Sequence, residues 1–137
     1  MRFFTGYVTV RSFNGYALPV PVQNKLLRNY AKDNNMIYVL PQCEMITNEN
    51  YMMLFDTLNS IENNSDLGMC SIHMLPKNNK KFLKILKIVK DKELLLHFMF
   101  EETKINSDQL YEYYIENNIN NLLQIKNKDY FKEHLEQ

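Results

Sequence analysis

Two kinds of apolar pattern alternate along the chain. Short stretches rich in aromatic, aliphatic and β-branched residues predict four strands, at residues 2–10, 37–40, 67–72 and 94–100. Apolar residues at helical spacing follow each of the first three stretches and predict helices around residues 20–33, 52–61 and 76–89. After Glu101 the chain is again helical in character, with Ser107 as the expected cap.

This alternation predicts an α/β fold with a short, mainly parallel four-stranded sheet flanked by helices. Right-handed crossovers favour the doubly wound strand order 2-1-3-4. We expect residues 1–105 to form the α/β domain and residues 106–137 to add a C-terminal helical appendage to the same domain. Ligands of such sheets bind beyond the carboxyl ends of the strands, so the functional site is expected at that edge.

Length, charge and cysteine content narrow the function classes. The 137 residues are enough for one domain with its own core. The 16 basic and 16 acidic residues cancel, which argues against nucleic acid as a partner of the whole molecule. No stretch has the roughly 18 apolar residues of a membrane span, the start does not resemble a signal peptide, and the two cysteines show no disulfide or zinc spacing. We therefore expect a cytoplasmic protein without membrane insertion.

Polar residues at the predicted carboxyl edge form the candidate ligand site. Arg11 follows the first strand and could hold a phosphate or carboxylate, or it could be an ordinary surface arginine. The other candidate ligand-binding residues follow strands or belong to the first helix, where capping and solvation are the alternative roles: Ser12, Gln23, Asn24, Arg28, Ser71 and His73.

His97 and Glu101 form the candidate acid–base pair, if the site is catalytic at all. The alternative is a buried neutral imidazole that is satisfied by one hydrogen bond, because apolar residues flank His97 in its strand. No GxGxxG, P-loop or compact metal-ligand spacing is present, so we expect neither a cofactor nor a metal.

Two further features could bind a partner. Seven lysines lie between Lys77 and Lys92 and form either a basic patch or a solvated helix face. The cluster of Tyr111, Tyr113 and Tyr114 could contact a partner or pack the tail onto the sheet.

Several separated motifs resemble the bacterial sporadic carbohydrate cluster family. They are Gly6-Tyr7-Val8-Thr9 with Arg11, the segment from Pro19 to Asn24 with Arg28 and Tyr30, Met69-Cys70-Ser71 with Met74-Leu75-Pro76, and His97-Phe98 before Glu101. The resemblance implies a role in bacterial surface polysaccharide or lipopolysaccharide synthesis, without assigning a reaction. We expect a phosphorylated or nucleotide-linked sugar as the ligand. The alternative is a non-catalytic adaptor that binds a pathway enzyme or its own copy.

The layout of the first segments also resembles the catalytic domain of serine recombinases. Where the resemblance would put the nucleophilic serine this chain has Arg11, with Ser12 one place later, and Thr9 and His73-Met74 replace the arginine and the Asp-Arg pair of that family. Strand exchange needs the serine and the arginines that stabilise the transferring phosphate. We therefore expect the fold without the recombinase activity, and DNA binding is the most remote alternative.

Overall fold

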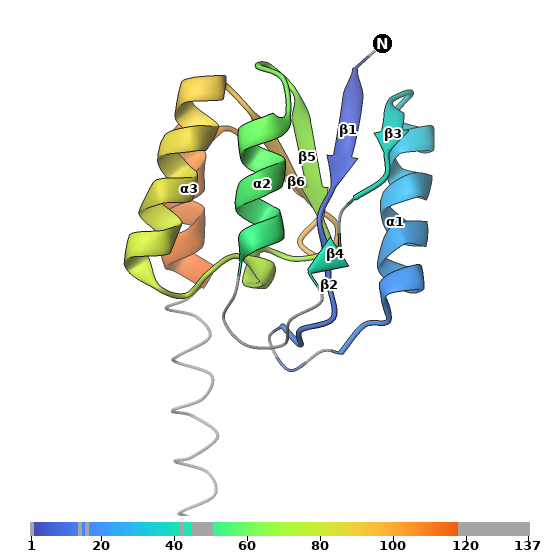
Figure 1. The fold of residues 1–137 in the computed structure, drawn as a ribbon, viewed down its shortest axis with the longest axis horizontal. Helices are drawn as coiled ribbons and strands as arrows, with labels where there is room; N and C mark the ends of the chain where they lie inside the picture. Colours follow the sequence, from blue (N-terminus) through green and yellow to red (C-terminus); the bar gives the residue numbers. More distant parts are fainter. Residues whose placement is uncertain (1, 14, 16, 42, 45–50, 118–137) are drawn as a thin grey trace, which may run out of the picture.

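The computed structural model describes residues 2–13, 15, 17–41, 43–44 and 51–117. Its main sheet has five strands in the order β3-β1-β5-β6-β7. The four parallel strands are β1 (Phe3–Gly6), β3 (Ile37–Val39), β5 (Asp66–Met69) and β6 (Leu95–Phe98), and β7 (Thr103–Ile105) runs antiparallel to β6. Figure 1 shows helices on both faces of this sheet.

The α/β class and the mostly parallel sheet are confirmed, but the sheet has five strands instead of four. The missed strand, β7, follows β6 after a tight turn through residues 99–102. It has three residues, of which Lys104 is charged and exposed. Unlike β3, which is equally short but apolar, β7 therefore has no apolar run that a sequence pattern could reveal.

The stretch 2–10 is divided between two sheets. Tyr7 still donates its backbone N–H to the carbonyl of Gly68. Beyond it, β2 (Val8–Thr9) pairs in parallel with β4 (Cys43–Glu44) in a separate two-stranded sheet. The chain after β1 therefore leaves the main sheet just where it approaches the carboxyl edge.

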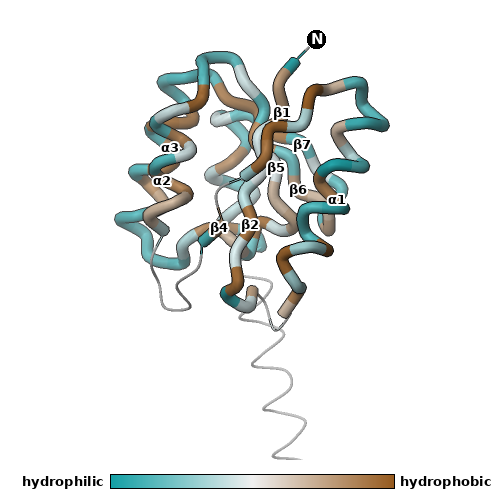
Figure 2. The backbone as a smooth tube through the Cα atoms, turned by 45° about the vertical axis from the view of Figure 1, so that its right-hand side comes forward, coloured by the Kyte–Doolittle hydropathy of each residue, from teal (hydrophilic) through white to brown (hydrophobic). Residues whose placement is uncertain are grey.

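Helix α1 (Val20–Asp33) covers one face of the sheet, and α2 (Met52–Ser60) and α3 (Asn79–Lys92) cover the other (Figure 1). Hydrophilic and hydrophobic residues alternate along these helices in Figure 2, as in helices with one buried side. The stretch 67–72 ends earlier than expected, because β5 is followed by a short 3-10 helix, η1 (Ile72–Met74).

Two apolar cores separate the helices from the sheet. The larger core lies beneath α2 and α3 and includes Leu54, Leu58, Phe82 and Ile85. The smaller one lies beneath α1 and consists of Phe4, Val8, Leu27 and Ala31.

A further helix begins at residue 107 and is described to residue 117. Its Tyr114 ring stacks on Phe82 at 3.6 Å between centroids, and its hydroxyl donates to the carbonyl of Pro76 at 2.6 Å. The described part of the predicted appendage thus packs against α3 and contributes to the larger core, while residues 118–137 lie outside the described residues. None of the described helices combines the length and the apolar character that crossing a membrane requires.

Candidate functional site

Arg11 follows β2 at the carboxyl edge of the sheet, and its side chain reaches Tyr51, just before α2, and Met74, at the end of η1. Its Nη2 donates to the hydroxyl of Tyr7 at 3.3 Å and to the carbonyl of Met74 at 3.2 Å. The guanidinium carbon lies 4.1 Å from the centroid of the Tyr51 ring. Hydrogen bonds and ring stacking therefore hold this guanidinium in one orientation at the edge.

A second cation approaches the same ring. Nζ of Lys81, in the first turns of α3, lies 5.6 Å from the Tyr51 centroid. Arg11 and Lys81 are 70 positions apart in the sequence, and Tyr51 is the residue just before α2. The fold thus gathers two positive charges around one aromatic side chain.

A buried carboxylate lies beneath this group. Glu44, at the end of β4, is 1% exposed. It accepts the Tyr7 hydroxyl at 3.0 Å and the backbone N–H groups of Met53 and Leu54 at 3.1 and 3.3 Å. Burial raises the pKa of Tyr7 far above its ordinary range, so the phenol stays protonated and donates. Glu44 therefore compensates the positive N-terminus of α2 and fixes Tyr7 under Arg11.

Ser71 and Glu101 form a second polar group at the edge. The Glu101 carboxylate accepts the backbone N–H of Ile72 at 2.6 Å and the Ser71 hydroxyl at 3.0 Å. Ser71 Oγ in turn accepts the backbone N–H of His73 at 3.2 Å and caps η1. Burial lowers the pKa of His73, and the nearby Glu101 partly opposes this shift. Glu101 is thus a capping carboxylate of η1.

Three predicted ligand-binding residues of α1 have structural partners. The Gln23 side chain is fully buried and bonds the backbone of Thr9 and Leu18. Asn24 accepts the Tyr38 hydroxyl at 2.7 Å, and the exposed Arg28 lies 5.8 Å from the centroid of the same ring. Gln23 is therefore corrected from a ligand-binding to a framework residue, because both of its N–H donors and its oxygen are used within the fold.

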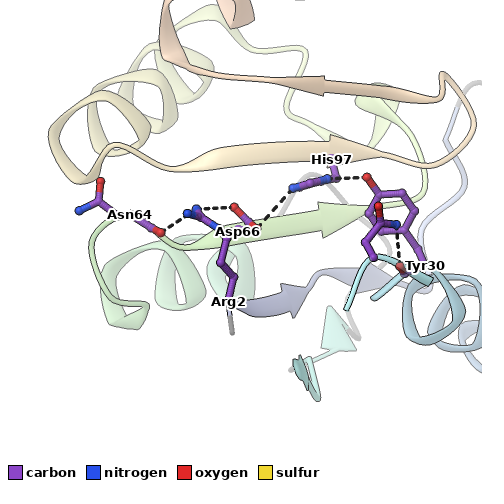
Figure 3. A network of polar contacts seen from close by, with 6 residues as sticks. Arg2, Tyr30, Asn64, Asp66 and His97 are labelled. Carbon is purple, nitrogen blue, oxygen red and sulfur yellow. Dashed lines mark hydrogen bonds and ion pairs between the residues drawn. The ribbon is translucent and has the colours of Figure 1, made fainter. Parts of the chain in front are cut away.

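His97 lies on the other face of the sheet from Arg11. Its neighbours are Phe4 and Tyr30, on the α1 side, whereas Arg11 contacts Tyr7 and Tyr51 on the side of α2 and α3. Nδ1 of His97 lies 2.7 Å from the Tyr30 hydroxyl, and Nε2 lies 3.8 Å from Oδ2 of Asp66 (Figure 3).

The predicted pairing of His97 with Glu101 is therefore wrong. Successive side chains of a strand point to opposite faces, and His97 points toward α1 with Tyr30 and Asp66 as its partners. Glu101 lies in the turn after β6 and points to Ser71 and η1. A single site that combines Arg11 with His97 does not form.

The structure brings Arg11 close to residues that sequence reasoning did not assign to the site: Tyr7, Tyr51 and, around the Tyr51 ring, Lys81. Glu44, which sequence reasoning did place at this edge after its strand, reaches Arg11 through the Tyr7 hydroxyl. In the sequence, Lys81 is one of seven lysines around its helix, and nothing there distinguishes it from the others. Its neighbour Tyr51 does not belong to any motif that would indicate a site. Ser12 is exposed next to Arg11. Within the described residues, no three His, Cys, Asp or Glu side chains are grouped as a metal site would require.

The fold of the described residues has a similar solved structure. A resolvase family site-specific recombinase from Streptococcus pneumoniae is similar in fold, with a TM-score of 0.62 and 12% sequence identity over 98% of this chain and 99% of that chain. At this identity the similarity shows the fold alone. No protein-family model and no curated protein matches the chain, so the resemblance to the sporadic carbohydrate cluster family has no support from these comparisons.

Proposed function

We propose that the chain binds a phosphorylated ligand, a sugar phosphate or nucleotide-linked sugar, at the carboxyl edge of its sheet. The observation that carries the proposal is the approach of Arg11 and Lys81 to one ring, at 4.1 and 5.6 Å from the Tyr51 centroid. A guanidinium and an ammonium held in this arrangement can donate hydrogen bonds to phosphate oxygens.

The N-termini of the helices at this edge differ in whether a carboxylate compensates their positive charge, and this difference favours a phosphate near Lys81. Glu44 compensates the N-terminus of α2, and Glu101 compensates that of η1. The first turn of α3 contains no acidic residue, and Lys81 lies within it. The positive end of α3 thus adds to the two side-chain cations instead of opposing them.

The sugar and the pathway, bacterial surface-carbohydrate synthesis in the cytoplasm, rest on the sequence motifs and not on the geometry. The fold argues for phosphate recognition without strand exchange. Arg11 stands where the recombinase resemblance would put the nucleophile, and a guanidinium binds phosphate but does not attack it.

A thermal-shift titration tests the proposal. We expect UDP-glucose or glucose 1-phosphate to raise the melting temperature, since a ligand at a hundred times its Kd stabilises the folded state by about 2.7 kcal/mol. Arg11→Ala and Lys81→Ala should each reduce the shift. Lys87→Ala, an exposed position of the same helix, is the matched control and should keep it. Equal shifts in all variants, or none with any phosphorylated ligand, would refute the site.

A second candidate is a non-catalytic adaptor or homo-oligomer in the same pathway. The observation that favours it is a hollow of about 390 Å³ beside α2, in which Phe3 and Leu40 are 51% and 67% exposed. Its apolar lining residues are Phe3, Val39, Leu40 and Ile61, and its polar ones are Thr5, Thr57, Ser60, Glu62 and Ser65. Such a patch is typical of an interaction surface. Sedimentation of the protein and of Leu40→Asp tests it: a monomer in both cases would exclude self-association through this surface.

A further inference from the structure

A second polar hollow, of about 450 Å³, lies at the opposite end of the sheet from Arg11. Residues that precede or begin the parallel strands line it, together with the last turn of α1 and the residues just after it. Its polar lining consists of Asp66, His97, Tyr30, Arg2, Lys104, Asn34 and Asn35. No residue of the proposed phosphate site belongs to it.

Two ionisable side chains are buried at this hollow. Asp66 is 2% exposed and His97 is 3% exposed. Burying a carboxylate beside an imidazole is costly unless both are satisfied. Arg2 satisfies Asp66 with two bonds, from Nε at 2.9 Å and from Nη2 at 2.8 Å. His97 is satisfied on one side only, because Nε2 is a buried polar atom that makes no hydrogen bond with any described residue.

The geometry around Nε2 of His97 indicates which kind of group could form the missing hydrogen bond. The 3.8 Å between Nε2 and Oδ2 of Asp66 is too long for a direct hydrogen bond. The carboxylate favours the tautomer with the proton on Nε2, so that Tyr30 donates its hydroxyl proton to Nδ1. An oxygen about 2.8 Å from both atoms could accept from Nε2 and donate to the carboxylate. A hydroxyl group has both capacities.

The rim of the hollow carries positive charge. Lys104, on β7, is exposed, and the Arg2 side chain is 54% exposed. Arg2 uses Nε and Nη2 for Asp66 and for the carbonyl of Asn64, and Nη1 takes part in none of these bonds (Figure 3). The charges of the lining, two cations and one carboxylate, leave an excess that suits one anionic group.

We propose that this hollow is a second ligand site, which takes a small molecule carrying both a hydroxyl group and an anionic group. The hydroxyl bridges His97 Nε2 and Asp66, and the anionic group lies against Lys104 and Arg2. A sugar phosphate and a hydroxy acid share this chemistry. The site is independent of the phosphate site at Arg11.

Titrations followed by NMR test the proposal on the intact chain. The probes are glucose 6-phosphate, which has both groups, glucose, which has only hydroxyls, and inorganic phosphate, which has only the charge. We expect glucose 6-phosphate to shift the ring nitrogen resonances of His97 and to bind more tightly than either other probe. Lys104→Met should weaken this binding about tenfold, the effect of losing one hydrogen bond to a charged group.

Two variants serve as controls. Lys84→Met, at an exposed position of α3, and Arg11→Ala, at the other edge, should leave the His97 shifts unchanged. Lys104 is exposed, so its replacement should leave the amide spectrum of the fold intact. Unshifted His97 resonances with all probes would overturn the proposal. So would equal binding of inorganic phosphate and glucose 6-phosphate, or a loss in Arg11→Ala without a loss in Lys104→Met.

Discussion

The Gln23 side chain bonds both backbone groups of Thr9, as a neighbouring strand would. Its Nε2 donates to the Thr9 carbonyl at 2.8 Å, and its Oε1 accepts the Thr9 N–H at 3.2 Å. The second Nε2 proton goes to the carbonyl of Leu18 at 2.8 Å. The Gln23 side chain thus fixes β2, which lies outside the main sheet. It thereby also fixes the start of the segment that carries Arg11.

Replacement of Gln23 should therefore destabilise the fold strongly. Gln23→Leu would leave the buried N–H and carbonyl of Thr9 without partners, at a cost of about 1–3 kcal/mol for each group. We expect a loss of about 2–5 kcal/mol in the free energy of unfolding, measured by urea denaturation. Lys25→Leu, an exposed position of the same helix, should change stability by less than about 0.5 kcal/mol. A small effect of Gln23→Leu would show that β2 does not depend on this side chain.

Gly68 should tolerate no side chain because the ring of Phe4 occupies the space. A Cβ at residue 68 would lie 2.0 Å from Cζ of Phe4, which is fully buried against Tyr30 and His97. We expect Gly68→Ala to cost about 1–3 kcal/mol of unfolding free energy. In a Phe4→Leu background the same change should cost less, since the clashing ring is absent. An equal cost in both backgrounds would mean that the ring is not the cause.

Acid should destabilise the protein through His97. Burial lowers the pKa of its imidazole below the ordinary value of 6.5, and the nearby carboxylate of Asp66 only partly opposes this. The unfolded chain then binds the proton more readily than the folded one. The stabilisation is complete above pH 6.5 and declines as the pH falls toward the folded-state pKa of His97. The total loss is about 1.4 kcal/mol for each pH unit by which the folded-state pKa lies below the unfolded-state pKa.

The groups that face His97 are Asp66 on β5, Tyr30 on α1, Lys104 on β7 and Arg2. Urea denaturation between pH 7.5 and 4.5 measures the effect. The free energy of unfolding of His97→Gln should depend less steeply on pH than that of the unmodified chain. His73→Gln is the comparison, because burial also lowers the pKa of His73 and its removal should reduce the slope separately. Parallel curves for His97→Gln and the unmodified chain would contradict the assignment.

Sequence patterns predicted the parts of the fold that follow from local periodicity. The bounds of α1 at Val20 and Asp33 agree with the apolar spacing behind Pro19, and three of the parallel strands lie within the expected stretches, with β5 beginning one residue earlier. Strand β7 was missed because it is short and has a charged residue, Lys104, at its centre, whereas the equally short β3 is apolar throughout.

The sequence predicted at which edge of the sheet the candidate site lies, but not which residues meet there. Arg11 reaches the carboxyl edge because strand direction determines that position. Its neighbours cannot be predicted from the spacing of residues along the chain. Tyr51 contacts Arg11, and Lys81 approaches Tyr51, because α2 packs beside α3. For His97, alternation along the strand decides which face it points to, and the sequence did not reveal which face α1 would cover.

Glu44 should be the residue on which both α2 and the tyrosine beneath Arg11 depend. Its buried carboxylate accepts two backbone N–H groups at the start of α2 and the hydroxyl of Tyr7. Glu44→Ala would remove all three bonds and leave buried donors, so we expect a loss of about 2–5 kcal/mol in unfolding free energy.

Tyr7→Phe in the same experiment should cost about 1–3 kcal/mol, because it removes the bond to the Glu44 carboxylate and the longer bond from Arg11. Because the two residues share a bond, the double variant should be less destabilised than the sum of the single ones, by about 0.5–3 kcal/mol. Circular dichroism should show helix loss in Glu44→Ala but not in Tyr7→Phe. Strictly additive costs would mean that the bond of 3.0 Å between Tyr7 and Glu44 contributes nothing to holding Tyr7 under Arg11.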